Sequence, residues 1–178
     1  YRANERKHGW ANHRQIPNQI RYFREKEHVA GGVFFSSKSL TNNLAGLSDS
    51  LRNDFFRYQA LPPTMPWLDN IPPNAPTNLQ VNLDNNQTAT LNWTAPSPAA
   101  DNEKAYGYVI YRSEDKQYSH SSSRNILKIL LAPSETSYTD ATILPNQRYY
   151  YMVTALDRLK NESEPSERIS IIKSTRNR

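Results

Sequence analysis

The chain has 178 residues, a net charge of +5 and no cysteine. This length allows one large or two small domains, and the absence of cysteine excludes disulfides and thiolate metal sites. Most of the positive excess lies in the first 70 residues, with ten Lys or Arg against six Asp or Glu. Signs alternate there, as in residues 24–27, so no single-sign basic stripe for nucleic acid is predicted. No apolar run reaches the roughly 18 residues of a membrane-spanning helix.

The first 61 residues predict a helix, a buried strand and a second helix. Residues 14–27 carry one apolar stripe at helical spacing (Ile16, Ile20, Phe23), and Pro17 suits the first turn. Residues 29–36, VAGGVFFS, are apolar on both faces, which is typical of a parallel strand covered by helices. Ser48 or Asp49 is expected to cap the second helix. This order is α/β, but a single strand has no partner for its backbone groups.

A proline-rich linker is predicted at residues 62–74. Six of the twelve prolines fall between Pro62 and Pro76. Proline fixes φ and disfavours helix at the preceding residue, so the segment should be extended and stiff. Trp67 and Leu68 lie within it, and large apolar residues in a linker predict packing between the two halves.

Residues 75–178 predict an all-β sandwich. Apolar and polar residues alternate with a period of two, as in residues 87–95 around Trp93, and turn residues separate the segments. The expected strands are residues 77–83, 87–95, 105–113, 126–131, 137–143, 148–157 and 168–173. Seven short strands in about 100 residues are typical of an immunoglobulin-like sandwich. The polar segment 114–125 is expected to be a long loop.

Several motifs in this half resemble the fibronectin type III family. They are Trp93, the strand GYVIYR, the run from Leu144-Pro145 to Tyr149 and Ala155, and Ser163-Glu164-Pro165-Ser166. The resemblance covers roughly residues 73–173. It implies a core position for Trp93 and a corner at Tyr149, whose hydroxyl would bond to nearby backbone. The fold carries no general catalytic site.

The first half resembles the C-terminal end of a glycoside hydrolase family 10-like TIM barrel. The resemblance rests on Gly-Gly-Val-Phe-Phe-Ser-Ser in the predicted strand and on Ala-Leu-Pro-Pro at the end. It implies that residues 29–37 are the eighth barrel strand and that residues 1–61 are a barrel remnant. The rest of the barrel would be the partner of this fragment. It also implies a bacterial protein located in the periplasm or at the cell surface, or anchored there by lipid through an upstream segment.

The chain alone is expected to be catalytically inactive. Glycoside hydrolysis requires two carboxyl groups facing one sugar bond, and TIM barrels place them at the ends of strands. Glu5 follows the seventh strand implied by the resemblance, and Ser37 and Lys38 end the eighth, so these three could face a sugar. The partner carboxylate would come from an earlier strand. The four histidines show no metal-ligand spacing, and no cofactor motif is present, so neither metal nor cofactor is predicted.

Two other interpretations compete with the enzyme fragment. The sandwich could bind polysaccharide or a protein partner through outward-facing tyrosines, for which Tyr106, Tyr111, Tyr118 and Tyr150 are candidates. Alternatively, the first half could be an independent α/β domain that completes its sheet by pairing with a second copy of the chain. Two helices and one strand bury little apolar area, so that domain would be marginal alone.

Overall fold

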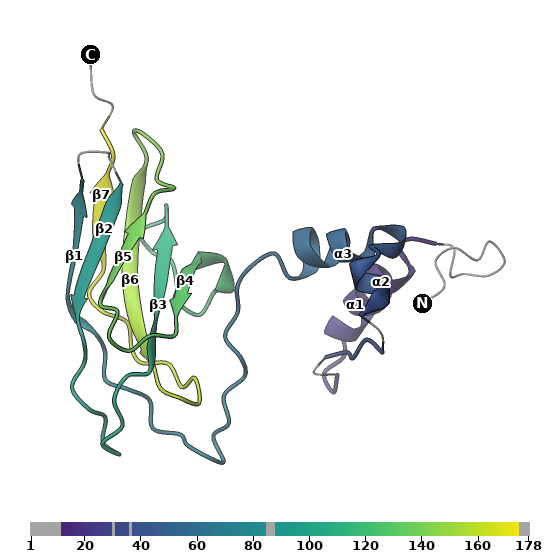
Figure 1. Ribbon diagram of the computed structural model, residues 1–178, viewed down its shortest axis with the longest axis horizontal. Helices are drawn as coiled ribbons and strands as arrows, with labels where there is room; N and C mark the ends of the chain where they lie inside the picture. Colours follow the sequence, from purple (N-terminus) through teal and green to yellow (C-terminus); the bar gives the residue numbers. More distant parts are fainter. Residues whose placement is uncertain (1–11, 30, 36, 85–87, 175–178) are drawn as a thin grey trace. The chain divides into compact units, whose positions relative to one another are not determined.

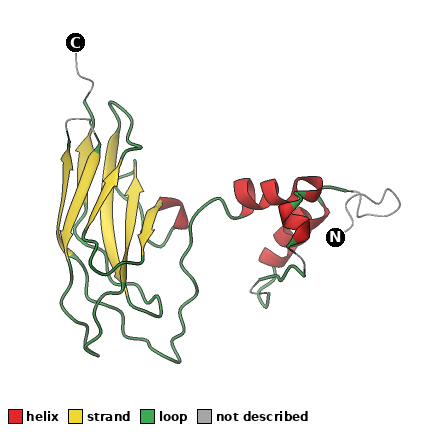
Figure 2. Ribbon diagram, viewed as in Figure 1, coloured by secondary structure: helices red, strands yellow, loops and turns green. Residues whose placement is uncertain are grey.

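The computed structural model describes residues 12–29, 31–35, 37–84 and 88–174. The chain divides into two compact units, residues 1–57 and 58–178. Figures 1 and 2 show helices α1 to α3 in the first unit and all seven strands in the second. Within the described ranges, no helix has both the length and the apolar character needed to cross a membrane.

The first unit is built from short helical elements: α1 (Gln15–Arg24), α2 (Lys38–Thr41), η2 (Leu44–Gly46), α3 (Leu47–Ser50) and the π-type turn η3 (Leu51–Phe55). The predicted first helix is confirmed as α1, with Pro17 in its first turn. Arg21 and Arg24 of α1 lie over the ring of Phe55, at 4.9 and 5.2 Å from its centroid. Arg24 also donates a hydrogen bond to the Phe55 carbonyl at 2.9 Å. These contacts hold α1 against η3.

The predicted strand at residues 29–36 is wrong in the part of it that the structure describes. Val29 and residues 31–35 form no strand, while Ala30 and Ser36 lie outside the described residues. Val33 and Phe35 are fully exposed. A parallel strand needs hydrogen-bonding neighbours, and the described residues of the first unit supply none.

The second predicted helix begins at Leu47 and is not capped by Ser48 or Asp49. It follows Gly46 at φ 70°, a left-handed conformation that glycine adopts without strain. The Asn43 side chain accepts a hydrogen bond from the Asp49 amide at 3.3 Å and donates one to the Asp49 carboxylate at 2.7 Å. Asn43 therefore takes over the role expected of Ser48 or Asp49, and the expected cap is corrected.

The second unit is the predicted sandwich. Its strands are β1 (Thr77–Leu83), β2 (Ala89–Thr94), β3 (Gly107–Ser113), β4 (Ile126–Leu130), β5 (Ser137–Asp140), β6 (Arg148–Leu156) and β7 (Ile169–Ile172). They form antiparallel sheets in the orders β1-β2-β5 and β4-β3-β6-β7. All seven predicted strands are confirmed, although β5 ends three residues early. It ends where the Asp140 carboxylate accepts hydrogen bonds from the amide and hydroxyl of Thr142, which turns the chain.

The core lies between the two sheets and contains the residues that the alternation assigned to it. Trp93 is 5% exposed, and its ring packs edge-to-face on Tyr108 at 5.3 Å. The Tyr149 hydroxyl accepts a hydrogen bond from the Leu144 amide at 3.3 Å, which confirms the expected corner. Other buried members of this core are Leu79, Leu91, Ile110, Tyr151 and Val153.

A second apolar cluster covers the outer face of β3 and β6. It comprises Val109, Tyr111, Tyr118, Met152 and Leu156. Tyr118 comes from the polar segment 114–125, which also forms the short helix η4 (Ser123–Asn125). Leu61, from the start of the proline-rich segment, packs on the same cluster. A face that alternation would leave to solvent is therefore covered by two segments from elsewhere in the chain.

Candidate functional site

The residues expected to face a sugar in the first unit are not brought together in the described structure. Glu5 lies outside the described residues. Ser37 and Lys38 are exposed at the start of α2. The Ser37 carbonyl accepts hydrogen bonds from the amides of Leu40 and Thr41, both at 2.9 Å. Ser37 thus starts a helical turn, and its contact with a sugar, like that of Lys38, stays a prediction.

Tyr111 does not face outward as expected. It is 1% exposed, and its hydroxyl donates a hydrogen bond to Glu162 Oε1 at 2.5 Å. The Thr154 hydroxyl donates to the same oxygen at 2.6 Å. Burial and the neighbouring Glu162 carboxylate raise the pKa of Tyr111 well above its ordinary value. A side chain so enclosed cannot stack on a sugar, so Tyr111 is corrected to a structural role.

Tyr118 is also buried, at 7% exposure. Its hydroxyl donates a long hydrogen bond of 3.4 Å to the Tyr111 carbonyl, and the Arg168 guanidinium lies 5.1 Å from its ring centroid. Burial raises its pKa above the ordinary range. The expectation that Tyr118 presents a binding surface is therefore wrong. Tyr150 is half-buried against the same cluster, whereas Tyr106 is 45% exposed, as expected.

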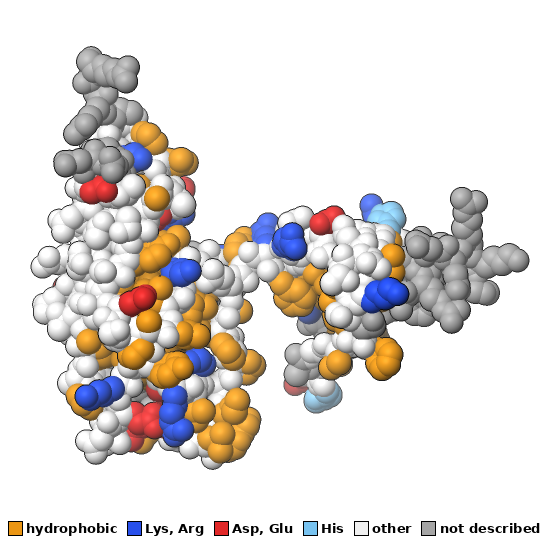
Figure 3. All heavy atoms as spheres, in the orientation of Figure 1, with side chains coloured by type: hydrophobic (Ala, Val, Ile, Leu, Met, Phe, Trp, Pro, Cys, Tyr) orange, Lys and Arg blue, Asp and Glu red, His pale blue; other side chains and the backbone are white. Residues whose placement is uncertain are grey.

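Tyr106 lines a groove of about 440 Å³ in the second unit. The groove is formed by the segment after β2, the segment leading into β3, the loop between β4 and β5, and the loop after β6. Its lining residues are Ala95, Pro96, Pro98, Glu103, Lys104, Ala105, Tyr106, Tyr108, Pro133 and Arg158. Small-molecule sites typically have such a mostly apolar lining with a few polar groups and a volume of roughly 300–1,000 Å³. At the lower end of the sandwich, Figure 3 shows apolar, acidic and basic side chains side by side.

The exposed ring of Tyr106 is held in place from two sides. Its amide donates a hydrogen bond of 2.6 Å to the Leu156 carbonyl, which ties the approach to β3 to the end of β6. The Lys160 ammonium lies 4.3 Å from the ring centroid. Lys160 itself does not line the groove. A cation over an aromatic face stabilises this placement.

Glu103 is positioned by a tight turn and paired with Arg158. Asn102 has φ 66°, its amide bonds to the Ala99 carbonyl at 3.0 Å, and the Ala99 amide bonds to the Glu103 carbonyl at 2.9 Å. Arg158 Nε donates to Glu103 Oε1 at 2.9 Å. Because this carboxylate favours the charged guanidinium, it raises the pKa of Arg158 above its ordinary value. The pair sets one donor and one acceptor group beside the tyrosine.

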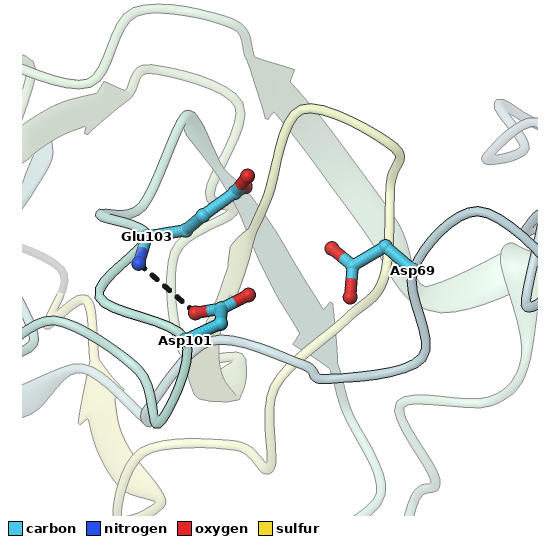
Figure 4. Close-up of side chains that lie close together, drawn as sticks. All are labelled: Asp69, Asp101 and Glu103. Carbon is cyan, nitrogen blue, oxygen red and sulfur yellow. Dashed lines mark hydrogen bonds between the residues drawn. The ribbon is translucent and has the colours of Figure 1, made fainter.

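Two more carboxylates lie beside Glu103 (Figure 4). Asp69, Asp101 and Glu103 each offer an oxygen, and these oxygens all lie within 4.8 Å of one another. Asp101 Oδ1 accepts a hydrogen bond from the Glu103 amide at 2.9 Å. Asp69 Oδ1 accepts one from the Ile71 amide at 2.9 Å, while Oδ2 is buried without a hydrogen-bond partner among the described residues. These are the oxygens that could hold a hard divalent cation.

Asp69 reaches this place because the proline-rich segment packs along the sandwich. Asn161 Nδ2 donates to the Asp69 carbonyl at 3.1 Å, and Asn74 Nδ2 donates to the Pro98 carbonyl at 2.9 Å. Trp67 and Leu68 of this segment are 76% and 63% exposed on the second unit, and their packing between the two halves stays a prediction. Sequence reasoning missed the acidic group because Asp69 and Asp101 are 32 positions apart in the sequence. Only the Asp101-Asn102-Glu103 turn offered a local signal.

The fold and the sequence together define the family. Residues 74–172 match the family model described as "Fibronectin type III domain". That match covers more than half of the chain, and the chain belongs to the fibronectin type III family. A solved structure described as "a Fn3-like protein from Clostridium thermocellum" is 24% identical and covers 60% of this chain and 97% of its own, with a TM-score of 0.46.

One curated relative extends the similarity beyond the sandwich. The chain is 38% identical over 160 residues to "Glycosyl hydrolase YngK" of Bacillus subtilis (strain 168), covering 89% of this chain and 30% of that protein. It is 29% identical over 103 residues to "Exoglucanase B" of Cellulomonas fimi, covering 58% of this chain and 8% of that protein. The chain thus spans less than a third of the length of each of these relatives.

Proposed function

We propose that this chain is a C-terminal portion of a glycoside hydrolase, in which the sandwich is an accessory domain beside a family 10-like catalytic barrel. The observation that carries the proposal is the similarity to the Bacillus glycosyl hydrolase over 160 residues. Residues 74–178 are too few to account for that length, so the similarity extends into the first unit. Both units therefore resemble consecutive parts of one larger protein.

The exposed apolar side chains of the first unit support this proposal. Val33 and Phe35 are fully exposed, and Phe56 and Tyr22 are 61% and 54% exposed. A groove of about 450 Å³ lies between α1 and residues 29 and 31–34. Its lining includes Ile16, Ile20, Phe23, Val29, Val33 and Phe34. Clustered apolar side chains of this kind usually mark an interface. We assign the preceding barrel of the parent protein as its occupant, which would also give residues 29–36 neighbouring strands.

The way in which the proline-rich segment is attached to the sandwich supports a spacer or scaffold role. Leu61, Asp69 and Asn74 fix the proline-rich segment to the sandwich by packing and hydrogen bonds. Little free chain then remains between the two units, and a stiff, short connection keeps an accessory domain near its catalytic partner. The proposal includes an extracytoplasmic location, because a polymeric glycan cannot cross a membrane before it is cut.

The test compares three polypeptides on soluble polysaccharides by reducing-sugar release. They are the full-length parent, the parent without residues 74–178, and the 178-residue chain. We expect hydrolysis by the parent, reduced hydrolysis of polymers by the shortened parent, and none by the chain, because the partner carboxylate of Glu5 would come from an earlier strand of the parent barrel. Hydrolysis by the chain alone, or an inactive parent on every glycan tested, would overturn the proposal.

A further inference from the structure

We propose that the groove lined by Tyr106, Glu103 and Arg158 binds a neutral glycan chain. The choice of a glycan rests on the proposed function, since an accessory domain of a glycoside hydrolase meets its substrate. Of the four tyrosines that the sequence suggested, Tyr106 lines this groove, whereas Tyr111 and Tyr118 are buried. Tyr106 is the exposed aromatic residue of this groove, with 45% of its surface accessible.

The apolar lining suits the C–H faces of a pyranose ring. Tyr106 presents an aromatic surface, and Pro96, Pro98 and Pro133 line the same groove. The proline rings are rigid and lose little conformational entropy when a ligand binds, which favours affinity. The Lys160 ammonium and the Leu156 carbonyl already fix Tyr106 in the free protein. The groove therefore presents a preorganised platform to the ligand.

The polar groups suit sugar hydroxyls, which both donate and accept hydrogen bonds. The hydrogen bond from Arg158 to Glu103 uses Nε. Its two Nη groups have no protein hydrogen-bond partner among the described residues, and the side chain is 64% exposed. The second carboxylate oxygen of Glu103 can accept from a hydroxyl. A planar donor and a planar acceptor thus stand beside the aromatic ring.

The charges favour a neutral glycan over an acidic one. Asp69 and Asp101 lie beside Glu103, with oxygens of all three within 4.8 Å. A uronate or sulfate group near Glu103 would meet this carboxylate and the nearby charges of Asp69 and Asp101. Arg158 is already paired with Glu103, which leaves Lys104 as the other cation in the lining. Like charges at this separation repel unless a cation intervenes. Neutral glucans, xylans and chitin fragments avoid that repulsion.

The test is isothermal titration of the 178-residue chain with cellohexaose, xylohexaose, maltohexaose and chitohexaose, with a uronic acid hexamer in parallel. We expect at least one neutral hexamer to bind with a dissociation constant in the range of about 10 µM to 1 mM. Tyr106→Ala should weaken that binding about tenfold or more, and Arg158→Ala severalfold. Tyr106→Phe should bind within about twofold of the natural chain, because the ring is kept.

Tyr22→Ala is the matched control. Tyr22 is an exposed tyrosine, at 54%, and carries the Lys26 ammonium at 4.5 Å from its ring centroid, but it belongs to the first unit. It should leave the affinity unchanged. Three results would each overturn the groove proposal. They are no binding of any neutral hexamer, an equal loss of affinity in Tyr106→Ala and Tyr22→Ala, and tighter binding of the uronic acid hexamer than of every neutral one. Because the readout is binding and not turnover, such a failure leaves the hydrolase proposal to its own experiment.

Discussion

Tyr151 of β6 donates its hydroxyl hydrogen to the carboxylate of Asp140 in β5 at 2.9 Å, and so joins the two sheets through the core. Arg112 of β3 reaches the same carboxylate oxygen at 2.7 Å. Asp140 has no exposed surface, so its charge is tolerated only because these partners surround it. This polar junction, more than the surface ion pairs, ties the sheets to one arrangement.

Removing the Asp140 carboxylate should destabilise the sandwich strongly. In Asp140→Ala the Tyr151 hydroxyl and the Arg112 guanidinium both lose a partner, and we expect a loss of about 3 kcal/mol in the free energy of unfolding. Urea denaturation measures it. Ser137→Ala, at an exposed position of the same strand, should change stability by less than about 0.5 kcal/mol. Equal effects of the two variants would show that the junction is not a major source of stability.

The free energy of unfolding should decrease in acid because Asp140 becomes protonated. Burial alone would raise the pKa of Asp140, but hydrogen bonds from Thr142 and Arg112 outweigh it and hold the pKa below its ordinary value. The unfolded chain has a carboxyl pKa of about 3.9, so the stabilisation is complete above that pH and is lost as pH falls towards the folded pKa. Melting temperatures between pH 3 and 7 measure this. In Asp140→Asn the melting temperature should fall less steeply as the pH drops towards 3. An unchanged pH dependence would show that Asp140 is not the source of the acid sensitivity.

Gly107 should not tolerate a side chain. A Cβ at this position would lie 2.3 Å from the Leu130 carbonyl oxygen, a backbone atom of the neighbouring strand. Gly107→Ala must therefore push β3 and β4 apart, and we expect a cost of about 2 kcal/mol or more. Gly32→Ala is the control, since nothing lies within 4 Å of its added Cβ. Calorimetry should show a lower melting temperature for Gly107→Ala than for Gly32→Ala. Equal melting temperatures would show that Gly107 does not lie so close to the Leu130 carbonyl.

The folded sandwich should extend beyond the family match towards the N-terminus. Leu61 packs on the outer cluster, and the Asp69 carbonyl accepts a hydrogen bond from Asn161. Both precede residue 74, where the match begins. A chain of residues 74–178 should therefore be less stable than residues 58–178 by about 1–3 kcal/mol. Urea midpoints of the two shortened chains provide the comparison, and identical midpoints would show that the segment is only a tether.

The sequence predicted much of the fold because strand patterns are local. Trp93, Leu91 and Ala89 alternate with polar neighbours, and this period of two places them on one face whatever the rest of the chain does. The predicted strand is wrong at Val29 and residues 31–35, where the apolar pattern indicated a strand that does not form. Apolar character sets what a segment would bury, but a strand forms only where another backbone offers hydrogen bonds.

The candidate site was less predictable for a related reason. Tyr106 and Tyr111 both lie at or beside β3 and carry similar sequence signals, yet one is 45% exposed and the other 1%. The difference arises because the segment carrying Tyr118, together with Leu61, covers Tyr111. Likewise, Asp69 meets Glu103 only because the proline-rich segment packs along the sandwich.

The sequence by itself determined the sandwich and its tryptophan core, which follow from alternation, and the tyrosine corner, which the resemblance to fibronectin type III domains implied. Only the tertiary structure decided which aromatic residues reach solvent and which charged groups stand beside Tyr106. Those outcomes depend on the packing of sequence-distant segments over the sheet. Hydrophobic burial is non-directional, so this packing produces no periodic pattern in the sequence.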